Sequence, residues 1–339
     1  MIQQTEIYKL AQMGLSTGFI QKMGPETGHH PGFAFPHLLT GAATDAVVLE
    51  LGHGEALLSV THFATPFVDE PFNYGRIASA HSLNRIYALG GEPVLATATL
   101  GWPSDQLPTE AAEQVAEGSR SLCAEAGVLL ASIHRIKSPE IYFGLTVTGK
   151  VRLHHLKQTS TATEGCCLYL TKPLGLGILT TAMQQDLLSP EQTELALEHL
   201  THLNTFGIFL GKLPYVKAVA PVGSTGLLGA LTHLAESSGL SADIDFHNVP
   251  VWPDLDSYLS PAALSSRAQS TWNSLATKIN EVPDEQQRIL ADPQPNGGLL
   301  IAVDSRSATE FEQVAFEHKL YLKAFGQLIE QQEKVVYVR

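Results

Sequence analysis

The amino-acid sequence predicts an α+β protein of two domains. Its 339 residues exceed the length at which one hydrophobic core usually keeps growing. Strand-like and helix-like stretches alternate on both sides of a polar segment at residues 152–164, which is typical of a domain boundary. We therefore expect an irregular arm over residues 1–37, an N-terminal domain over 38–155 and a C-terminal domain over 156–339.

The N-terminal domain is predicted to place helices on one sheet. Residues 45–51 and 55–61 are apolar runs separated by a Gly-His-Gly turn, which indicates a β-hairpin. Apolar residues recur at helical spacing over residues 73–89, and the glycine pair that follows is a stop signal. The remaining expected elements are a helix over residues 109–126 and strands over residues 93–100, 128–133 and 142–151.

The C-terminal domain is predicted to mix helices and short strands as well. Its expected helices span about residues 179–185, 191–204, 227–237 and 308–318. Its expected strands lie at residues 166–170, near Val216, and at residues 242–246, 299–303 and 335–338. This pattern gives a second α+β domain.

Composition limits the classes of function. Apolar residues make up 44% and charged residues 16% of the chain, as in soluble globular proteins. The net charge of −13 argues against a nucleic-acid-binding protein, which usually carries a basic face. No apolar run approaches the roughly 20 residues of a membrane-spanning helix. The N-terminus lacks a signal-peptide pattern, and three cysteines show neither disulfide nor zinc spacing, so we expect a cytoplasmic protein.

A glycine-rich element at residues 170–182 is the most conspicuous motif. Gly175 and Gly177 fall between an expected strand and an expected helix. Backbone N–H groups at such a position can hold an anion. A close crossing of strand and helix would also require glycine, so both interpretations stay open.

Several sequence blocks, in order and spacing, resemble those of the selenophosphate synthetases (selenide, water dikinases). The blocks are TPFVDEPFNYGRIA at 65–78, YALGG at 87–91, LTVTG at 145–149, LTKPLGLGILTTA at 170–182, TGLLG at 225–229, and DPQ at 292–294 with GGLL at 297–300. The resemblance implies the two-domain fold of aminoimidazole ribonucleotide synthetase, with N-terminal domains pairing in a dimer. It also implies a reaction in which ATP, selenide and water give selenophosphate, AMP and phosphate, with Mg²⁺ on the polyphosphate.

The metal and nucleophile positions of that family are largely replaced in this sequence. No cysteine precedes Cys123, so the nucleophile position has no candidate and we assign no catalytic residue. Asp45 is the one family metal ligand that is retained. His62, His81 and Arg85 stand where the family has aspartate, asparagine and aspartate.

Two further family elements have changed. Pro221 replaces another aspartate, and a glycine-rich family loop reads Ser-Ile-His-Arg-Ile-Lys at 132–137.

These substitutions predict an anion site without a metal. Mg²⁺ requires oxygen ligands, and at an effective dielectric near 20 a positive charge about 4 Å away opposes it by about 4 kcal/mol. An ion pair between Arg85 and Asp45 is the simplest replacement for the metal. The candidate residues for a basic pocket that binds phosphate or a nucleotide such as ATP are His62, His81, Arg85, His134, Arg135 and Lys137, together with Gly175 and Gly177.

Two functions follow from the resemblance and its departures. The first is a catalytically impaired or repurposed subunit that binds an anion or nucleotide, as a homodimer or as a heterodimer with a related synthetase. The alternative is an active ATP-dependent selenide, water dikinase, for which Asp69 and Glu70 are the nearest replacement carboxylates.

Overall fold

The computed structural model describes Leu39, residues 46–259 and residues 266–339. The expected N-terminal arm and Asp45 lie outside these residues, and so does the expected ion pair between Asp45 and Arg85.

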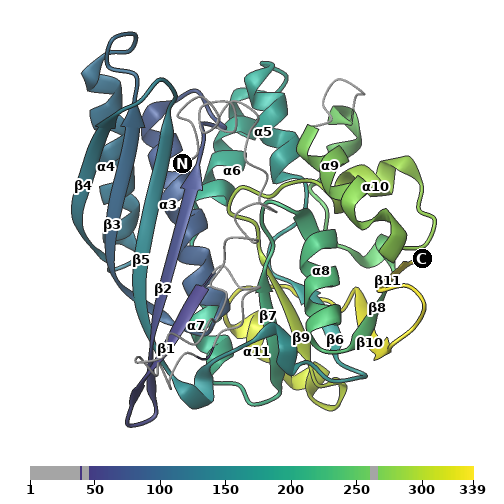
Figure 1. Ribbon diagram of the computed structural model, residues 1–339. Coiled ribbons are helices and arrows are strands. Elements are labelled where there is room, and N and C mark those ends of the chain that lie inside the picture. The colour runs from purple at the N-terminus through teal and green to yellow at the C-terminus, as the bar shows by residue number, and fades with distance from the viewer. Residues whose placement is uncertain (1–38, 40–45, 260–265) are drawn as a thin grey trace, which may run out of the picture.

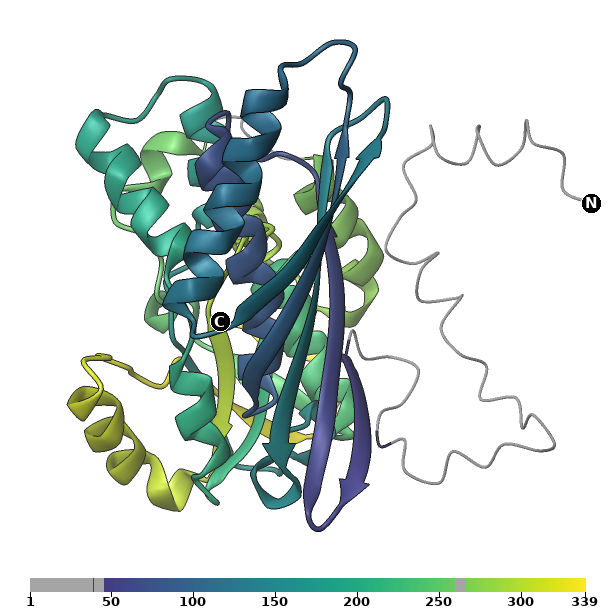
Figure 2. The same cartoon turned by 90° about the vertical axis from the view of Figure 1, so that its left-hand side faces the viewer.

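The first half of the chain forms a five-stranded sheet, sheet A, in the order β1-β2-β5-β3-β4 (Figure 1). Its strands are β1 (Ala46–Gly52), β2 (Glu55–Ala64), β3 (Glu92–Trp102), β4 (Leu129–Lys137) and β5 (Tyr142–Arg152). Helices α3 (Pro71–Ala88) and α4 (Thr109–Glu125) cover one face of sheet A (Figure 2). The predicted hairpin is confirmed: β1 and β2 pair antiparallel, and the Gly-His-Gly turn adopts positive φ at all three residues.

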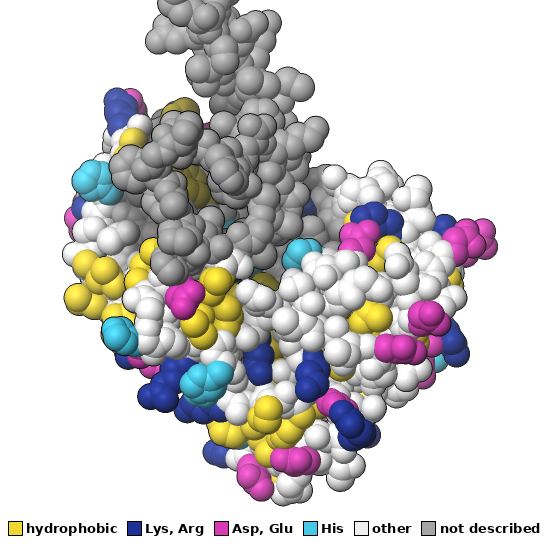
Figure 3. Space-filling model, turned by 60° about the horizontal axis from the view of Figure 1, so that its bottom comes forward, with side chains coloured by type: hydrophobic (Ala, Val, Ile, Leu, Met, Phe, Trp, Pro, Cys, Tyr) yellow, Lys and Arg dark blue, Asp and Glu magenta, His cyan; other side chains and the backbone are white. Residues whose placement is uncertain are grey.

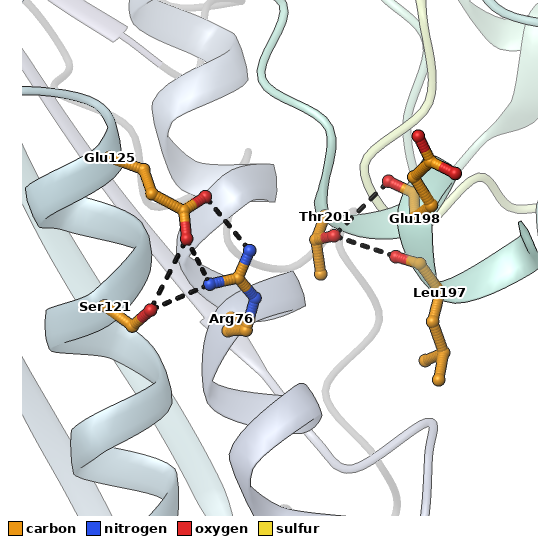
Figure 4. A network of polar contacts seen from close by, with 6 residues as sticks. All are labelled: Arg76, Ser121, Glu125, Leu197, Glu198 and Thr201. Carbon is orange, nitrogen blue, oxygen red and sulfur yellow. Dashed lines mark hydrogen bonds and ion pairs between the residues drawn. The ribbon is translucent and has the colours of Figure 1, made fainter. Parts of the chain in front are cut away.

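Helices α3 and α4 cross closely because each carries a glycine at the contact. A Cβ on Gly75 would collide with the carbonyl oxygen of Val115, and a Cβ on Gly118 with that of Phe72. Beside this crossing, the Arg76 guanidinium of α3 turns toward α4 (Figure 4). There it donates to the Ser121 hydroxyl over 2.8 Å and pairs with the Glu125 carboxylate.

The second half of the chain builds a six-stranded sheet, sheet B, in the order β11-β8-β10-β6-β9-β7. Its strands are β6 (Cys167–Leu170), β7 (Val216–Pro221), β8 (Leu240–Ile244), β9 (Leu299–Val303), β10 (Gly326–Glu330) and β11 (Val336–Val338). The helices of this half are α5 (Leu176–Gln184), α6 (Pro190–Thr201), α7 (Phe206–Gly211), α8 (Gly226–Ser237), α9 (Ser266–Leu275), α10 (Asp284–Leu290) and α11 (Ala308–Glu317). Every residue of β9 is buried, which explains its uninterrupted apolar sequence.

The predicted α+β class is confirmed, with two mixed sheets and helices packed on them. Helix α3 joins the two halves, because it packs against sheet A and also against α6, α7 and β7 (Figure 1). Each residue from Ile77 to Ala88 is therefore buried. Within the described ranges, no helix is long and apolar enough to cross a membrane.

Surface charge is mixed on the face drawn in Figure 3. There, Lys and Arg side chains lie beside acidic and hydrophobic ones among the coloured, described residues.

Candidate functional site

Helix α3 carries buried polar side chains on the side that meets the second half of the chain. His81, Asn84 and Arg85 fall three and four positions apart, so they lie on one helix face. They are 7%, 2% and 9% exposed. His81 and Asn84 bond to the segment of residues 292–298, which leads from α10 to β9. Buried polar groups of this kind require partners, and that segment supplies several.

His81 is held in one tautomer. Its Nδ1 accepts the backbone N–H of Asn296 over 3.0 Å, so in the neutral ring the hydrogen is on Nε2. Burial, followed by the positive charges of His62, Arg85 and Lys172, lowers the pKa of His81 well below its usual value. The ring is therefore neutral near pH 7. Among the described residues, its Nε2 has no hydrogen-bond partner.

His62 packs on His81 from sheet A. It lies on β2, on the same face as the buried Leu58 and Val60, which points to α3. The two imidazole centroids are 4.2 Å apart at an interplanar angle of 47°. We call His62, His81 and Arg85 the interdomain cluster, because it joins β2 and α3 to the segment that precedes β9.

Asparagine side chains connect α3 to the second half of the chain by hydrogen bonds. Asn84 donates its side-chain amide to the carbonyl of Gly297 over 3.0 Å. Asn204, just after α6, donates to the Asn84 side-chain oxygen over 2.9 Å and to the same Gly297 carbonyl. The side-chain amide of Asn296 donates to two carbonyls at the end of α6. These bonds fix the position of Asn296, whose backbone N–H holds His81 Nδ1.

Lys172 is a buried lysine that the sequence reasoning missed. Its ammonium donates to the carbonyls of His199, His202 and Asn296 over 3.2, 2.8 and 3.0 Å. Burial lowers the pKa of Lys172 to about 7. Three carbonyl acceptors occupy its three hydrogens, so Lys172 braces the segment 292–298 and adds positive potential rather than contacting a ligand directly. The sequence did carry a signal for a buried lysine, because Lys172 stands among apolar residues between an expected strand and an expected helix.

The N-terminus of α5 is already occupied by a carboxylate of this chain. Asp292 Oδ2 accepts the N–H groups of Gly177 and Ile178 over 3.0 and 3.2 Å, and Gln294 accepts that of Leu176. A Cβ on Gly177 would be 2.5 Å from Asp292 Oδ1, so glycine is required for this approach. The N–H groups that we expected to hold an external anion therefore hold Asp292. Burial raises the pKa of that carboxyl to about 7.

The six-residue basic pocket expected from the sequence is not assembled. His134, Arg135 and Lys137 lie on β4, and strands β5 and β3 separate β4 from β2. At about 4.8 Å per strand, this places them about 14 Å from the strand of His62. Arg135 and Lys137 are exposed and pair with Glu113 and Asp105 over 3.8 and 2.6 Å. The strand order of sheet A therefore places His134, Arg135 and Lys137 apart from His62 and α3.

The described residues do not fit a magnesium site. Within the part of the chain that the structure describes, no group of three His, Cys, Asp or Glu side chains could hold a metal. The cluster offers imidazole and guanidinium nitrogens, whereas Mg²⁺ prefers oxygen ligands. The replacement carboxylate suggested at Glu70 caps α3 instead, accepting the N–H groups of Phe72 and Asn73 over 3.3 and 2.7 Å.

Two family descriptions match the chain. Residues 43–151 match "AIR synthase related protein, N-terminal domain", and residues 163–339 match "AIR synthase related protein, C-terminal domain". Similar curated proteins carry the name selenide, water dikinase. That of Pseudomonas putida strain KT2440 is 45% identical over 305 residues, covering 89% of each chain. That of Photorhabdus laumondii is 42% identical over 308 residues, covering 90% of this chain and 89% of that one.

Solved structures share the fold at low identity. A thiamine-monophosphate kinase from Stenotrophomonas maltophilia K279a has a TM-score of 0.65 at 19% identity, covering 89% of this chain and 90% of that one. The hydrogenase maturation protein HypE, solved in complex with ATP, has a TM-score of 0.64 at 17% identity and covers 88% and 85%. The names of the curated relatives support the active alternative better than the impaired subunit that we placed first.

Proposed function

This chain is a member of the selenide, water dikinase family, and we propose that it catalyses the ATP-dependent phosphoryl transfer to selenide that this name describes. The observation that carries the proposal is 45% identity to a relative of that name over 305 residues. Both domains of the fold are included in that match. ATP is the expected co-substrate, and a protein of the same fold is described in complex with ATP.

The residues of the interdomain cluster suit the phosphate end of such a substrate. Arg85 supplies a guanidinium group, and guanidinium groups bind phosphate oxygens in pairs. His81 offers a neutral N–H donor in a buried setting, where hydrogen bonds to charged groups are stronger than in water. Lys172, in its protonated form, adds a positive potential from behind the segment 292–298. Mg²⁺ has no described ligand set here, so we assign it no step.

A second candidate function is favoured by the composition of the cluster itself. Imidazoles and a guanidinium occupy positions where the family resemblance leads us to expect carboxylate and amide ligands. A subunit that binds a nucleotide or another phosphate anion without turning it over would need these cations and no metal. This candidate predicts binding of ATP and no release of AMP.

Phosphorus NMR of the purified protein with Mg-ATP and selenide, kept reduced and anaerobic, separates the two functions. An authentic active synthetase serves as the positive control. Selenophosphate formed together with an equal amount of AMP supports the first function. Unchanged ATP beside a productive control rejects it and leaves the binding function.

We also expect a cytoplasmic homodimer formed through sheet A. The face of this sheet that α3 and α4 leave uncovered carries Val47, Leu51 and Phe63, which are 50%, 56% and 56% exposed. Exposed apolar side chains on one face of a sheet are typical of a protein interface. Sedimentation velocity at micromolar concentration tests this assembly, and a concentration-independent monomer rejects it.

A further inference from the structure

Basic side chains gather where β5 ends beside α7 (Figure 1). Arg152 is the last residue of β5, His154 and His155 belong to a short 3-10 turn at Leu153–His155, and Lys212 follows α7 directly. The two imidazole centroids are 4.2 Å apart, and the rings meet edge to face. Arg152, His154 and Lys212 are exposed, and His155 is partly buried. We call these four residues the basic surface.

The backbone beneath the basic surface is held between the ends of α3 and α7. A Cβ on Gly90 would lie 2.6 Å from the carbonyl oxygen of His155, and one on Gly211 would lie 3.0 Å from the same atom. The backbone N–H of Lys157 donates to the carbonyl of Leu89 over 3.1 Å. The Lys157 ammonium donates to two carbonyls just after α7, each over 2.8 Å. The backbone that carries the two histidines is therefore fixed before any partner binds, which lowers the entropy cost of binding.

The basic surface has no ion-pair partner among the described residues. Neither Arg152 nor Lys212 takes part in an ion pair or a side-chain hydrogen bond in that part of the chain. Glu55 stands opposite Arg152 in the pairing of β2 with β5, but these two described side chains form no ion pair. Burial, followed by the positive charges of the other three residues and of Lys157, lowers the pKa of His155. None of the causes of this shift is a carboxylate, so positive charge dominates around the ring.

Aromatic rings continue the basic surface along α7. Lys212 follows Phe209 by three positions, so the two lie on one side of the helix end. Phe206 and Phe209 are partly exposed, and their ring centroids are 6.0 Å apart. The His318 ring, at the end of α11, lies 5.1 Å from Phe206 and 4.5 Å from Phe209. Aromatic residues and arginine are both enriched at protein interfaces, so this combination is typical of a surface that binds another protein.

We propose that the basic surface and the aromatic rings beside it dock an acidic segment of a partner protein. Carboxylates of such a segment would meet Arg152 and Lys212, and its apolar side chains would pack on Phe209. The net charge of −13 repels a long polyanion such as RNA, whereas a short segment meets mainly the local charge. A second copy of this chain, paired about a two-fold axis at this surface, would set basic side chains against each other. The inference does not rest on the proposed function, because no residue of the interdomain cluster takes part.

Fluorescence anisotropy of a labelled acidic peptide, titrated with the full chain, tests the docking surface. The probe is a short synthetic peptide that alternates glutamate and leucine. We expect binding to weaken about tenfold or more in the double variant Arg152→Glu and Lys212→Glu, because the attraction to the peptide carboxylates becomes repulsion. The double variant Arg267→Glu and Arg120→Glu makes the same change of net charge at exposed positions on α9 and α4 and should bind as the wild type does. All four positions are exposed, so both variants should fold, which circular dichroism checks.

Equal affinity of the two double variants would overturn the proposal, because binding would then follow net charge alone. The absence of peptide binding by the wild type would overturn it as well. A single-stranded RNA of equal charge that binds more tightly than the peptide would assign the surface to nucleic acid instead. Sedimentation velocity tests the remaining occupant: a dimer that is lost only in Arg152→Glu with Lys212→Glu would reject the partner protein and assign the surface to a second copy of this chain.

Discussion

The carboxylate of Asp292 makes the stability of the fold depend on pH. Its side chain is 2% exposed and caps the N-terminus of α5, and burial raises its pKa to about 7 from an ordinary value of 3.8. An acid whose folded pKa is raised stabilises the folded state below its unfolded pKa. That contribution is lost as pH rises through the folded pKa. The affected window is therefore about pH 4 to 7.

The size of the effect follows from one proton. Within this window the folded state holds about one proton more than the unfolded state, and the free energy of unfolding falls by about 1.36 kcal/mol per pH unit. Asp292→Asn can present its amide oxygen where Oδ2 accepts from Gly177, Ile178 and Gln294, but it does not ionise. Between about pH 5 and pH 6.5, the wild type should lose about 2 kcal/mol relative to the variant.

Urea unfolding followed by tryptophan fluorescence measures this difference. Wild type and Asp292→Asn are compared at each pH, so that all other titrating groups cancel. A difference that stays constant across the window would refute the reasoning. A constant difference in this window, with a wild type that gains stability relative to the variant only as pH rises toward about 4, would show that the α5 N–H groups outweigh burial and hold the pKa of Asp292 low.

Three further substitutions test the packing and the assembly. Gly118→Ala should lower the free energy of unfolding by at least about 1–3 kcal/mol in urea, because its methyl group would push α3 away from α4. Glu117→Ala, at the neighbouring exposed position, is the control and should change the stability little. Lys172→Met should lower the free energy of unfolding by about 2–4 kcal/mol in the same assay, because it leaves three buried carbonyls without their donor. An unchanged stability would mean that these carbonyls find other partners. Phe63→Asp should convert the expected dimer to monomer in sedimentation velocity, while Phe316→Asp, at an equally exposed position on α11, should not.

Local signals predicted most of the architecture. The hairpin of β1 and β2 and the long helix α3 had strong turn and stop signals, and both formed within a few residues of the expected bounds. Helix α7 was not predicted, because its six residues, FGIFLG, are too short and too apolar to show a helical period. Strand β10 was not predicted either, because its five residues, GQLIE, combine one buried position with charged and polar neighbours.

The candidate site was only partly predictable, since it depends on contacts between distant segments. His62 and His81 were expected together and meet, with ring centroids 4.2 Å apart. His134 was expected beside them but lies on the far edge of sheet A, which only the strand order reveals. Asp292 accepts hydrogen bonds from the N-terminus of α5, although the two lie more than a hundred positions apart in the sequence. No local pattern around Gly177 indicates that partner.

A crystal structure with the ATP analogue AMPPCP and Mg²⁺ tests most directly whether phosphate is handled at the interdomain cluster. We expect the phosphate groups to lie beside the interdomain cluster. Phosphates bound elsewhere would contradict the assignment.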